Sequence, residues 1–247
     1  MTASPEFMLP LANYFLALAP AFLVWVALLA LVPRDAVIAR IILHILFFVL
    51  ARDAMTSSGF WQINAGSLRF TASEPILLFL AGMSGLLCLG TFWLEPAARD
   101  GMRFSGAGIV PAVAIGAGGA ILISVIAAFL KIFFSLPSLP APGPGAFPVL
   151  FIFSMAGNAY EELLFRGLLQ NTLSKILSPS RSAMVSGLLF CLCHSYLATT
   201  VTHIGAPILA FTLLEGLVAA FVYLRAGLLG AMLSHGLAIF VIAAGLY

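Results

Sequence analysis

Two adjacent glutamates and an arginine interrupt a long apolar stretch of the sequence, at Glu161, Glu162 and Arg166. Two later apolar stretches contain one histidine each, His194 and His235. A carboxylate and imidazoles that converge can activate water. The carboxylate removes a proton, one imidazole holds the water, and a further donor stabilises the developing oxyanion. These residue types therefore indicate hydrolytic chemistry, provided that the fold brings them together.

The composition defines the surroundings in which such chemistry would occur. Apolar residues make up 62% of the 247 residues and charged residues only 8%, whereas soluble domains carry roughly 25% charged residues. A water-facing globule, a disordered chain and a disulfide-stapled secreted module are therefore excluded. A nucleic-acid-binding protein would need more clustered Lys and Arg. The composition predicts an integral membrane protein.

The elements that position these side chains are predicted to be membrane-spanning helices, each of about 20 mostly apolar residues. Continuous apolar runs lack the alternation of a membrane β-barrel. The predicted fold class is therefore all-α: a polytopic transmembrane helical bundle that forms one integral membrane domain over residues 1–247. About eight stretches qualify or nearly qualify as spans, at 8–32, 36–51, 75–94, 107–134, 148–172, 182–199, 205–224 and 227–246.

Basic residues in the connections between these stretches predict the orientation of the chain. The odd-numbered connections hold seven basic residues, and the even-numbered ones hold two, with Lys131 near one helix end. We therefore expect the odd-numbered connections in the cytoplasm and both termini outside. The proline-rich fourth connection, residues 136–148, is expected to be a stiff external spacer. The seven basic residues of the odd-numbered connections are Arg34, Arg40, Arg99, Arg103, Lys175, Arg181 and Arg225, and the two of the even-numbered connections are Arg52 and Arg69.

Ionisable side chains at membrane depth are costly, at about 2.5–3.5 kcal/mol each near a helix centre. Glu162 and Arg166 are four residues apart in the favourable acid-before-base order, so we expect them to form an ion pair. Glu161 lies about 100° around the helix and has no such partner in the sequence, which favours a functional role. Glu215, in the seventh stretch, is interpreted as a structural residue. Three placements remain open for it: its side chain snorkels to the membrane interface, pairs with Arg166, or borders a substrate path.

At this point three segments resemble motifs of one family. Residues 161–166 (EELLFR) resemble the EExxxR motif of the CPBP family of intramembrane proteases, which includes CAAX prenyl endopeptidases and bacteriocin-processing enzymes. Residues 190–194 (FCLCH) are similar to its FxxxH motif, and residues 216–235 resemble its third block, which normally ends in HxxxN or HxxxD. The resemblance covers about residues 147–247, the predicted catalytic half.

The resemblance implies a glutamate-dependent protease that cleaves a membrane-associated, prenylated or leader-bearing peptide or protein in the lipid bilayer. It implies no cofactor and no nucleic-acid partner, and a place in the inner membrane of a prokaryotic cell. By position, Glu161 would be the general base, His194 would help it hold the nucleophilic water, and His235 would assist the oxyanion. Glu162 and Arg166 would be a supporting pair. Members were long called metalloproteases because two Glu and two His can bind zinc. The glutamate mechanism needs no metal, and we expect it here.

One position departs from the family pattern. The residue four after His235 is Ile239 rather than Asn or Asp. Asn158, one turn before Glu161 on the same helix, is a candidate to supply an amide donor instead. Two alternatives to a protease remain open. The first is a catalytically degenerate member that acts as a membrane scaffold or in bacteriocin self-immunity. The second is a transporter that uses the buried carboxylates as a proton relay. The sequence argues against it, because it lacks the paired interrupted helices that inverted repeats would show.

Overall fold

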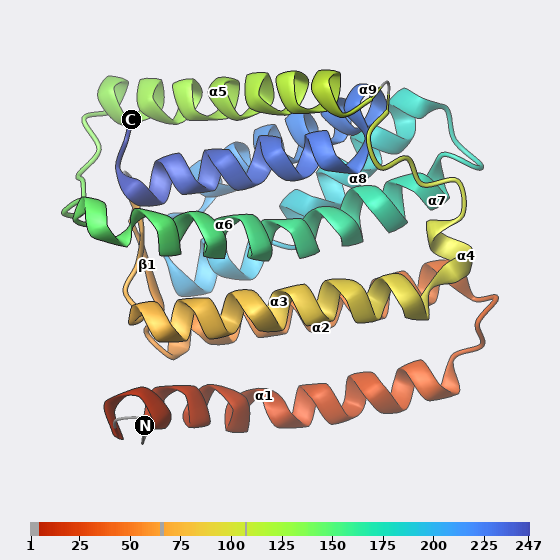
Figure 1. Ribbon diagram of the computed structural model, residues 1–247, viewed down its shortest axis with the longest axis horizontal. Coiled ribbons are helices and arrows are strands. Elements are labelled where there is room, and N and C mark those ends of the chain that lie inside the picture. The colour runs from red at the N-terminus through yellow and green to blue at the C-terminus, as the bar shows by residue number, and fades with distance from the viewer. Residues whose placement is uncertain (1–4, 65–66, 107) are drawn as a thin grey trace.

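The computed structural model describes residues 5–64, 67–106 and 108–247, and its long helices run side by side in one bundle (Figure 1). The predicted all-α bundle is confirmed, and the chain is an integral multi-pass membrane protein. The long helices are α1 (Pro5–Leu31), α2 (Val37–Ser57), α3 (Glu74–Leu94), α5 (Ile109–Phe133), α6 (Phe147–Glu162), α8 (Pro179–Leu192) and α9 (Ala206–Ala244).

Shorter elements connect or extend these helices. The helix that begins as α6 continues through a π-helical segment and then α7, so one continuous helix covers the fifth predicted span. A second π-helical segment follows α8 and lengthens the sixth. These elements are the strands β1 (Trp61–Asn64) and β2 (Ser67–Phe70), α4 (Pro96–Arg99), the 3-10 turn Pro144–Ala146, the π-helical segments Leu163–Gln170 and Leu197–Val201, and α7 (Asn171–Leu173).

A glycine divides α9 into two arms that fold back on each other. Gly227 has φ 71° and ψ −168°, a conformation that is essentially restricted to glycine. Glu215 and His235 are 20 residues apart, which would separate them by about 30 Å in a straight helix, but their side chains approach to 3.5 Å. The seventh and eighth predicted spans are therefore the two arms of an antiparallel hairpin within α9.

Five of the helices in the described part of the chain are long and apolar enough to cross a membrane. They are α1, α3, α5, α8 with its extension, and α9. The five helices are fewer than the roughly eight predicted spans, first because α9, which contains two of the predicted spans as its two arms, is counted once. In addition, α2 and α6 fall outside this length and composition limit. Both lie beside the other helices in the bundle (Figure 1).

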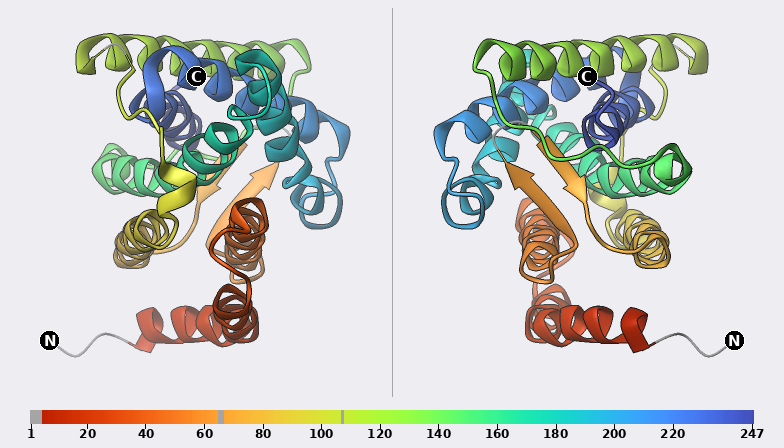
Figure 2. Two further views of the ribbon diagram at one scale, coloured as in Figure 1. Left: turned by 90° about the vertical axis from the view of Figure 1, so that its right-hand side faces the viewer. Right: turned by 90° about the vertical axis from the view of Figure 1, so that its left-hand side faces the viewer.

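A two-stranded hairpin closes one end of the bundle, and the apolar pattern gave no indication of it. β1 and β2 pair antiparallel, with Trp61 opposite Phe70, and they lie across the middle of that end (Figure 2). Arg69 donates hydrogen bonds to the carbonyl oxygens of Pro140 and Leu139 in the proline-rich connection. It also donates to Ile242 near the end of α9. Arg69 thus ties the hairpin, the proline-rich connection and the last helix together.

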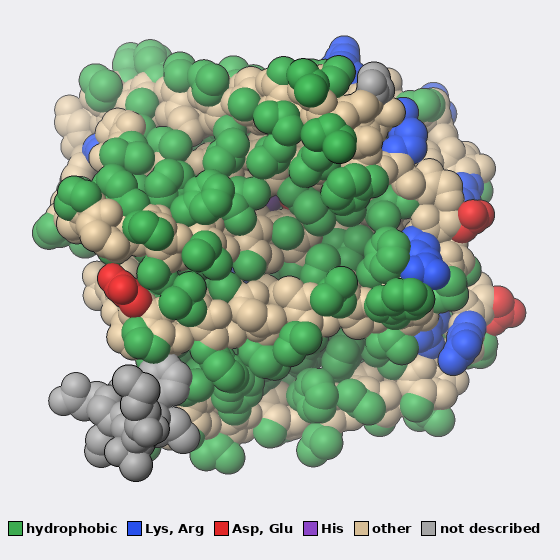
Figure 3. Space-filling view, viewed as in Figure 1, with side chains coloured by type: hydrophobic (Ala, Val, Ile, Leu, Met, Phe, Trp, Pro, Cys, Tyr) green, Lys and Arg blue, Asp and Glu red, His purple; other side chains and the backbone are tan. Residues whose placement is uncertain are grey.

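Two of the basic residues assigned to connections lie inside α2 instead. Arg40 and Arg52 are both helical, and Arg40 is buried against Glu95. Their partners explain the error, because a buried ion pair lets an arginine occupy a helix interior. Without these two, the odd-numbered connections still hold six basic residues against one, Arg69, with Lys131 near the end of α5. Figure 3 shows the Lys and Arg side chains gathered at one end of the molecule, opposite both termini in Figure 1.

The interior has two main apolar clusters. One surrounds Phe165 and Phe190, where the π-helical segment 163–170 packs against α8 and α9. The other joins α1, α2, α3 and α6 around Phe60 and Phe153. Small residues let α5 approach α9 closely. A Cβ at Gly116 would lie 2.7 Å from the backbone oxygen of Gly230, so close helix packing depends on this glycine.

Candidate active site

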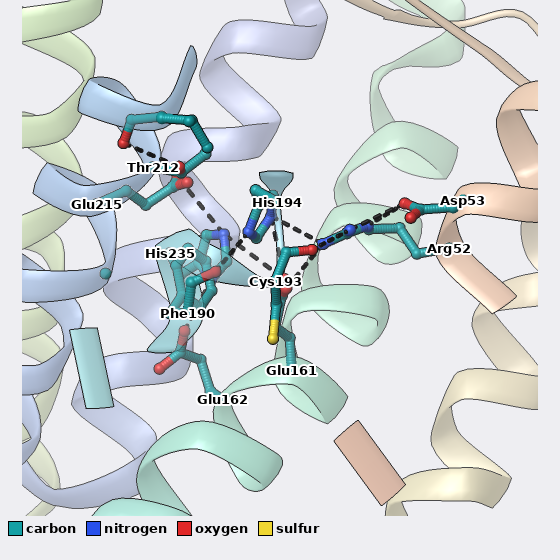
Figure 4. A network of polar contacts seen from close by, with 12 residues as sticks. Arg52, Asp53, Glu161, Glu162, Phe190, Cys193, His194, Thr212, Glu215 and His235 are labelled. Atoms are coloured by element: carbon teal, nitrogen blue, oxygen red, sulfur yellow. Dashed lines mark hydrogen bonds and ion pairs between the residues drawn. The ribbon is translucent and has the colours of Figure 1, made fainter. Parts of the chain in front are cut away.

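The structure brings the predicted site residues together from three segments. Glu161 and Glu162 end α6, His194 follows the last turn of α8, and His235 lies on the second arm of α9. All four side chains are buried, and they converge in one polar cluster (Figure 4). These four residues, which span 75 positions of the sequence, therefore lie in one site.

Glu161 lies between the two histidines. Its Oε1 is 3.8 Å from Nε2 of His194, and its Oε2 is 4.0 Å from Nε2 of His235. Both distances are too long for direct hydrogen bonds and suit one bridging water. Oε1 is buried and accepts no hydrogen bond from the residues that the structure describes. This carboxylate oxygen is therefore positioned to accept a proton from a water molecule.

The imidazole of His194 is oriented by the backbone. Its Nδ1 lies 2.8 Å from the carbonyl oxygen of Phe190, and a carbonyl oxygen can only accept, so Nδ1 carries the proton. In the neutral ring, Nε2 is then the acceptor, and it faces Glu161. His194 is thus set to accept a hydrogen bond on the side of the site where a water would lie.

Glu162 fixes the second histidine. Its Oε1 accepts hydrogen bonds from Arg166 Nη1 and from His235 Nδ1, each 2.8 Å long. Arg166 also donates to the carbonyl oxygen of Gly216 at 2.7 Å. The expected Glu162–Arg166 ion pair is therefore present, with both side chains fully buried. It holds His235 with Nε2 directed toward Glu161 and the cavity.

Phe190 packs beneath these groups. Its ring lies 4.7 Å from that of His194 and 5.5 Å from that of His235, measured between centroids. The guanidinium carbon of Arg166 lies 4.5 Å from the centre of the same ring. One aromatic side chain thus sets the spacing of the two imidazoles, and it places a π face against the buried arginine.

Glu215 joins the site from the first arm of α9. It is buried and lines the site cavity, so it does not snorkel. Its Oε1 is 3.5 Å from Nε2 of His235 and, within the described part of the chain, accepts no hydrogen bond. Of the roles considered from the sequence, a position on the border of the substrate cavity agrees with this placement. His235 consequently has Glu162 on one nitrogen and Glu215 near the other.

Asn158 and Ile239 both line the same cavity. The Asn158 amide donates one of its two N–H groups to the carbonyl oxygen of Ser154 at 2.6 Å. Ile239 follows His235 by one turn of α9 and presents only apolar surface. Beside His235, the amide or carboxylate of the family pattern is therefore replaced by a hydrocarbon wall.

Arg52 is a site residue that the sequence analysis missed. Its Nη1 lies 3.0 Å from Nε2 of His194 and 3.9 Å from Oε1 of Glu161. The sequence places Arg52 at the end of the second apolar stretch, far from every motif. The adjacent charges Arg52 and Asp53, directly after an apolar stretch, were the available signal, because ionisable residues beside membrane-depth segments often mark polar sites.

A cavity of about 1140 Å³ opens onto these residues. Its walls come from α1, α2, α3, α5, α6, α9 and the hairpin, and they are mostly apolar. Its ionisable lining residues include Arg52, Glu161, His194, Glu215 and His235, and Lys131 of α5 also lines it. A large apolar cavity with a few convergent polar groups is the usual form of a binding site.

Residues 142–241 match the family model of type II CAAX prenyl endopeptidases, described as Rce1-like. That segment contains all three motifs and every site residue except Arg52. Over this segment the chain is similar to the CAAX protease family. No curated protein and no solved structure matches the chain. The matched segment covers α6 to α8 and most of α9, while Arg52 lies in the preceding part of the chain.

The older description of CAAX proteases as metalloenzymes can be compared with the donor set. His194 Nδ1 donates to a backbone carbonyl, and the guanidinium of Arg52 donates to Nε2, the other ring nitrogen. A metal ligand must offer a free lone pair, and an adjacent fixed positive charge opposes a cation. Within the described residues, no group of three or more His, Cys, Asp or Glu side chains is arranged to hold a metal ion. These residues do not fit a zinc site.

Proposed function

We propose that this protein is an intramembrane endopeptidase in which Glu161 is the general base. The observation that carries the proposal is the buried Oε1 of Glu161, which accepts no hydrogen bond from the described residues and lies 3.8 Å from the accepting nitrogen of His194. A water that enters between these two atoms donates one proton to each once Arg52 Nη1, which donates to the same nitrogen in the structure, turns away from it. The match of residues 142–241 to the CAAX protease family model supports peptide-bond hydrolysis as the reaction.

The reaction proceeds in two steps. The water oxygen bonds to the carbonyl carbon of the substrate while its proton passes to Glu161, and the carbonyl oxygen becomes an oxyanion. His235, with protons on both nitrogens, donates Nδ1–H to Glu162 and has Nε2–H for the oxyanion. The C–N bond then breaks, and Glu161 returns the proton to the leaving amine. Loss of a single oxyanion donor costs roughly 10²–10³ in kcat in well-studied hydrolases.

We propose that Asn158 supplies a second donor where Ile239 removes one. It lies one helical turn before Glu161 and lines the cavity. The variant Asn158→Ala should lower kcat about tenfold, less than a primary donor, because one of its N–H groups is already bound to Ser154. Unchanged cleavage of a reporter peptide by this variant would remove Asn158 from the mechanism.

The substrate is a peptide or protein with an apolar segment that enters the cavity. The apolar walls support this class, because the transfer of apolar side chains from water into an apolar cavity is favourable. Prenylated CAAX tails, double-glycine leader peptides and carboxy-terminal sorting anchors all have such segments. We propose the inner membrane of a prokaryotic cell as the location.

The test uses purified protein in phospholipid nanodiscs and three internally quenched peptides. One ends in a prenylated CAAX tail, one carries a double-glycine leader, and one is a sorting anchor. We expect cleavage of at least one, with ¹⁸O from labelled water in the new carboxylate. Glu161→Gln should abolish cleavage and His194→Ala should nearly abolish it, whereas the exposed Glu74→Gln should leave it unchanged.

The same experiment separates the proposal from its alternatives. A scaffold or immunity protein would keep its biological activity in Glu161→Gln and His194→Ala variants that insert normally. A transporter would show proton-coupled uptake in proteoliposomes that Glu161→Gln abolishes. Either result, together with no cleavage by the wild-type protein, would overturn the proposed function.

A further inference from the structure

Arg52 is held so that one end of its guanidinium faces the site. Its Nε and Nη2 each lie 2.9 Å from Oδ1 of Asp53, and Nη2 also donates to the carbonyl oxygen of Cys193 at 2.8 Å. These contacts fix one edge of the planar fork. The remaining nitrogen, Nη1, projects toward His194 and Glu161 (Figure 4).

Three atoms at this point form a small triangle. Glu161 Oε1 and His194 Nε2 are 3.8 Å apart, Glu161 Oε1 and Arg52 Nη1 are 3.9 Å apart, and Arg52 Nη1 and His194 Nε2 are 3.0 Å apart. A point about 1.9 Å above the plane of such a triangle lies about 2.8 Å from all three corners, an ordinary hydrogen-bond length. One water oxygen at that point would contact all three side chains.

We propose that Arg52 is a further catalytic residue that binds the nucleophilic water together with Glu161 and His194. This inference rests on the proposed function, because it concerns the same water. It adds a group from the first half of the chain, outside the segment that matches the CAAX protease family. The site is then assembled from α2 as well as from α6, α8 and α9.

The hydrogen-bond roles of the three groups agree with one orientation of the water. Glu161 Oε1 and His194 Nε2 accept the two water protons, and Arg52, which can only donate, gives an N–H to one lone pair. The second lone pair is left for the carbonyl carbon. In the structure Arg52 Nη1 donates to Nε2 of His194 at 3.0 Å, so the Arg52 side chain must turn away from His194 before Nε2 can accept from the water.

The charge of Arg52 has a defined effect in the attacking step. The O–C bond forms, the water proton moves to Glu161, and negative charge accumulates on the oxygens around the carbonyl carbon. A guanidinium that is permanently positive, fixed and shielded from bulk water stabilises that charge without reorganisation of solvent. Asp53 holds the guanidinium in place without contacting the water itself.

The test compares Arg52→Gln and Arg52→Lys with the wild type, in nanodiscs, on whichever of the three quenched peptides the wild type cleaves fastest. We expect Arg52→Gln to lower kcat about 10²–10³-fold, with KM changed less than about threefold. Arg52→Lys keeps the charge without the planar fork, so its kcat should lie between the two. Millimolar guanidinium should restore part of the activity of Arg52→Ala, because the cavity has room for it, while sodium at equal ionic strength should not.

Arg40→Lys is the matched control. Arg40 is another buried arginine of α2, bonded to the carboxylate of Glu95, but it lies outside the cavity. Its variant should lower the thermal unfolding temperature and leave kcat unchanged. Circular dichroism and unfolding of each Arg52 variant would show that it is folded.

Each outcome decides between the two proposals. If Glu161→Gln is inactive but Arg52→Gln keeps kcat within about threefold of the wild type, the role of Arg52 is overturned and the protease mechanism stands. If Arg52→Ala is folded and inactive but guanidinium restores nothing, Arg52 is structural. If the wild type cleaves none of the peptides, both proposals fail together.

Discussion

Glu162 is the residue on which the polar network of the site depends most. Its Oε1 accepts from Arg166 and from His235 at the same distance, 2.8 Å. Arg166 and Glu162 are fully buried, so neither charge has access to water. A buried pair adds little to stability by itself, but removing one partner leaves an uncompensated charge. Glu162 thus couples the orientation of a site histidine to the stability of the fold.

The variant Glu162→Gln should therefore lower both stability and activity. We expect the free energy of unfolding to fall by about 3–5 kcal/mol, because Arg166 is left buried without a counter-charge. Chemical unfolding in detergent micelles measures this change. Asp100→Asn is the control, since Asp100 and Lys175 form an exposed pair 3.8 Å apart that is worth about 0–1 kcal/mol. Equal stabilities of the two variants would show that the buried network is not stabilising.

At the scale of the elements, the reversal of α9 at Gly227 decides whether a site exists. The first arm carries Glu215 and the second carries His235, and only the antiparallel arrangement brings them together. The segment before α5 packs against the reversal, where Leu228 and Leu229 donate backbone hydrogen bonds to Arg103 and Phe104. A Cβ at Gly227 would lie 2.7 Å from the carbonyl oxygen of Arg103. The reversal therefore requires glycine for both its backbone angles and its close packing.

We expect Gly227→Ala to be strongly destabilised and inactive. The positive φ and the clash with backbone atoms add, so the loss should exceed about 3 kcal/mol. Thermal unfolding of the purified protein measures it. Gly118→Ala is the matched control, because Gly118 is helical and nothing lies within 4 Å of its added Cβ. That variant should be as stable as the wild type or slightly more stable, and equal losses in both would contradict the structural role of Gly227.

A second buried cluster joins α2 to the connection between α3 and α4. Glu95 accepts hydrogen bonds from Arg40 at 2.8 Å and from His44 at 2.9 Å. Arg40 also donates to the carbonyl oxygens of Leu29 and Val32 at the end of α1. Burial by itself would raise the pKa of Glu95, but the hydrogen bonds and charges of His44 and Arg40 outweigh it and hold the pKa below its usual value.

This lowered pKa predicts a loss of stability in acid. A carboxyl group whose pKa is lower in the folded protein than in the unfolded chain contributes its stability above the unfolded value, about 4.3 for Glu. The contribution is lost as the pH falls through the folded value. Unfolding temperatures measured from pH 7 down to pH 3 should therefore fall less steeply in Glu95→Gln, which has no carboxyl group to titrate. Parallel curves for the variant and the wild type would contradict the prediction.

At the scale of the whole molecule, the two ends of the bundle differ in charge. Residues such as Arg34, Arg99 and Lys175 lie at one end, while the hairpin and the proline-rich connection lie at the other. Exposed hydrophobic side chains cover the faces between the two ends. The bias toward basic residues in cytoplasmic connections predicts that the basic end lies inside the cell.

Cysteine labelling tests this orientation. In intact cells a membrane-impermeant maleimide should label Ser138→Cys in the proline-rich connection. It should label Asp100→Cys, at the basic end, only after the cells are permeabilised. Both positions are exposed. The unsubstituted protein, with its free cysteines Cys88, Cys191 and Cys193, measures the background. The reverse labelling pattern would show that the chain is inserted the other way.

Much of the fold was predictable because hydropathy is a local property. The positions of the long helices follow from apolar runs, and the Glu162–Arg166 pair follows from helical spacing. The β1–β2 hairpin was missed because two strands of four residues are too short to show a pattern. Arg40 and Arg52 were misplaced because a charged residue in a helix interior reads as the end of a span unless its partner is known.

The sequence by itself determined the kind of protein: an apolar chain of membrane helices with a few ionisable groups that lipid would not tolerate unpaired. It also named Glu161, His194 and His235, since their types and motifs stand out against that background. Only the tertiary structure decided which groups meet. Arg52, 109 residues before Glu161, and Glu215, on the opposite arm of α9, reach the site through helix packing and the reversal at Gly227. Contacts of that range depend on how helices cross in three dimensions, and no local pattern of residue types records it.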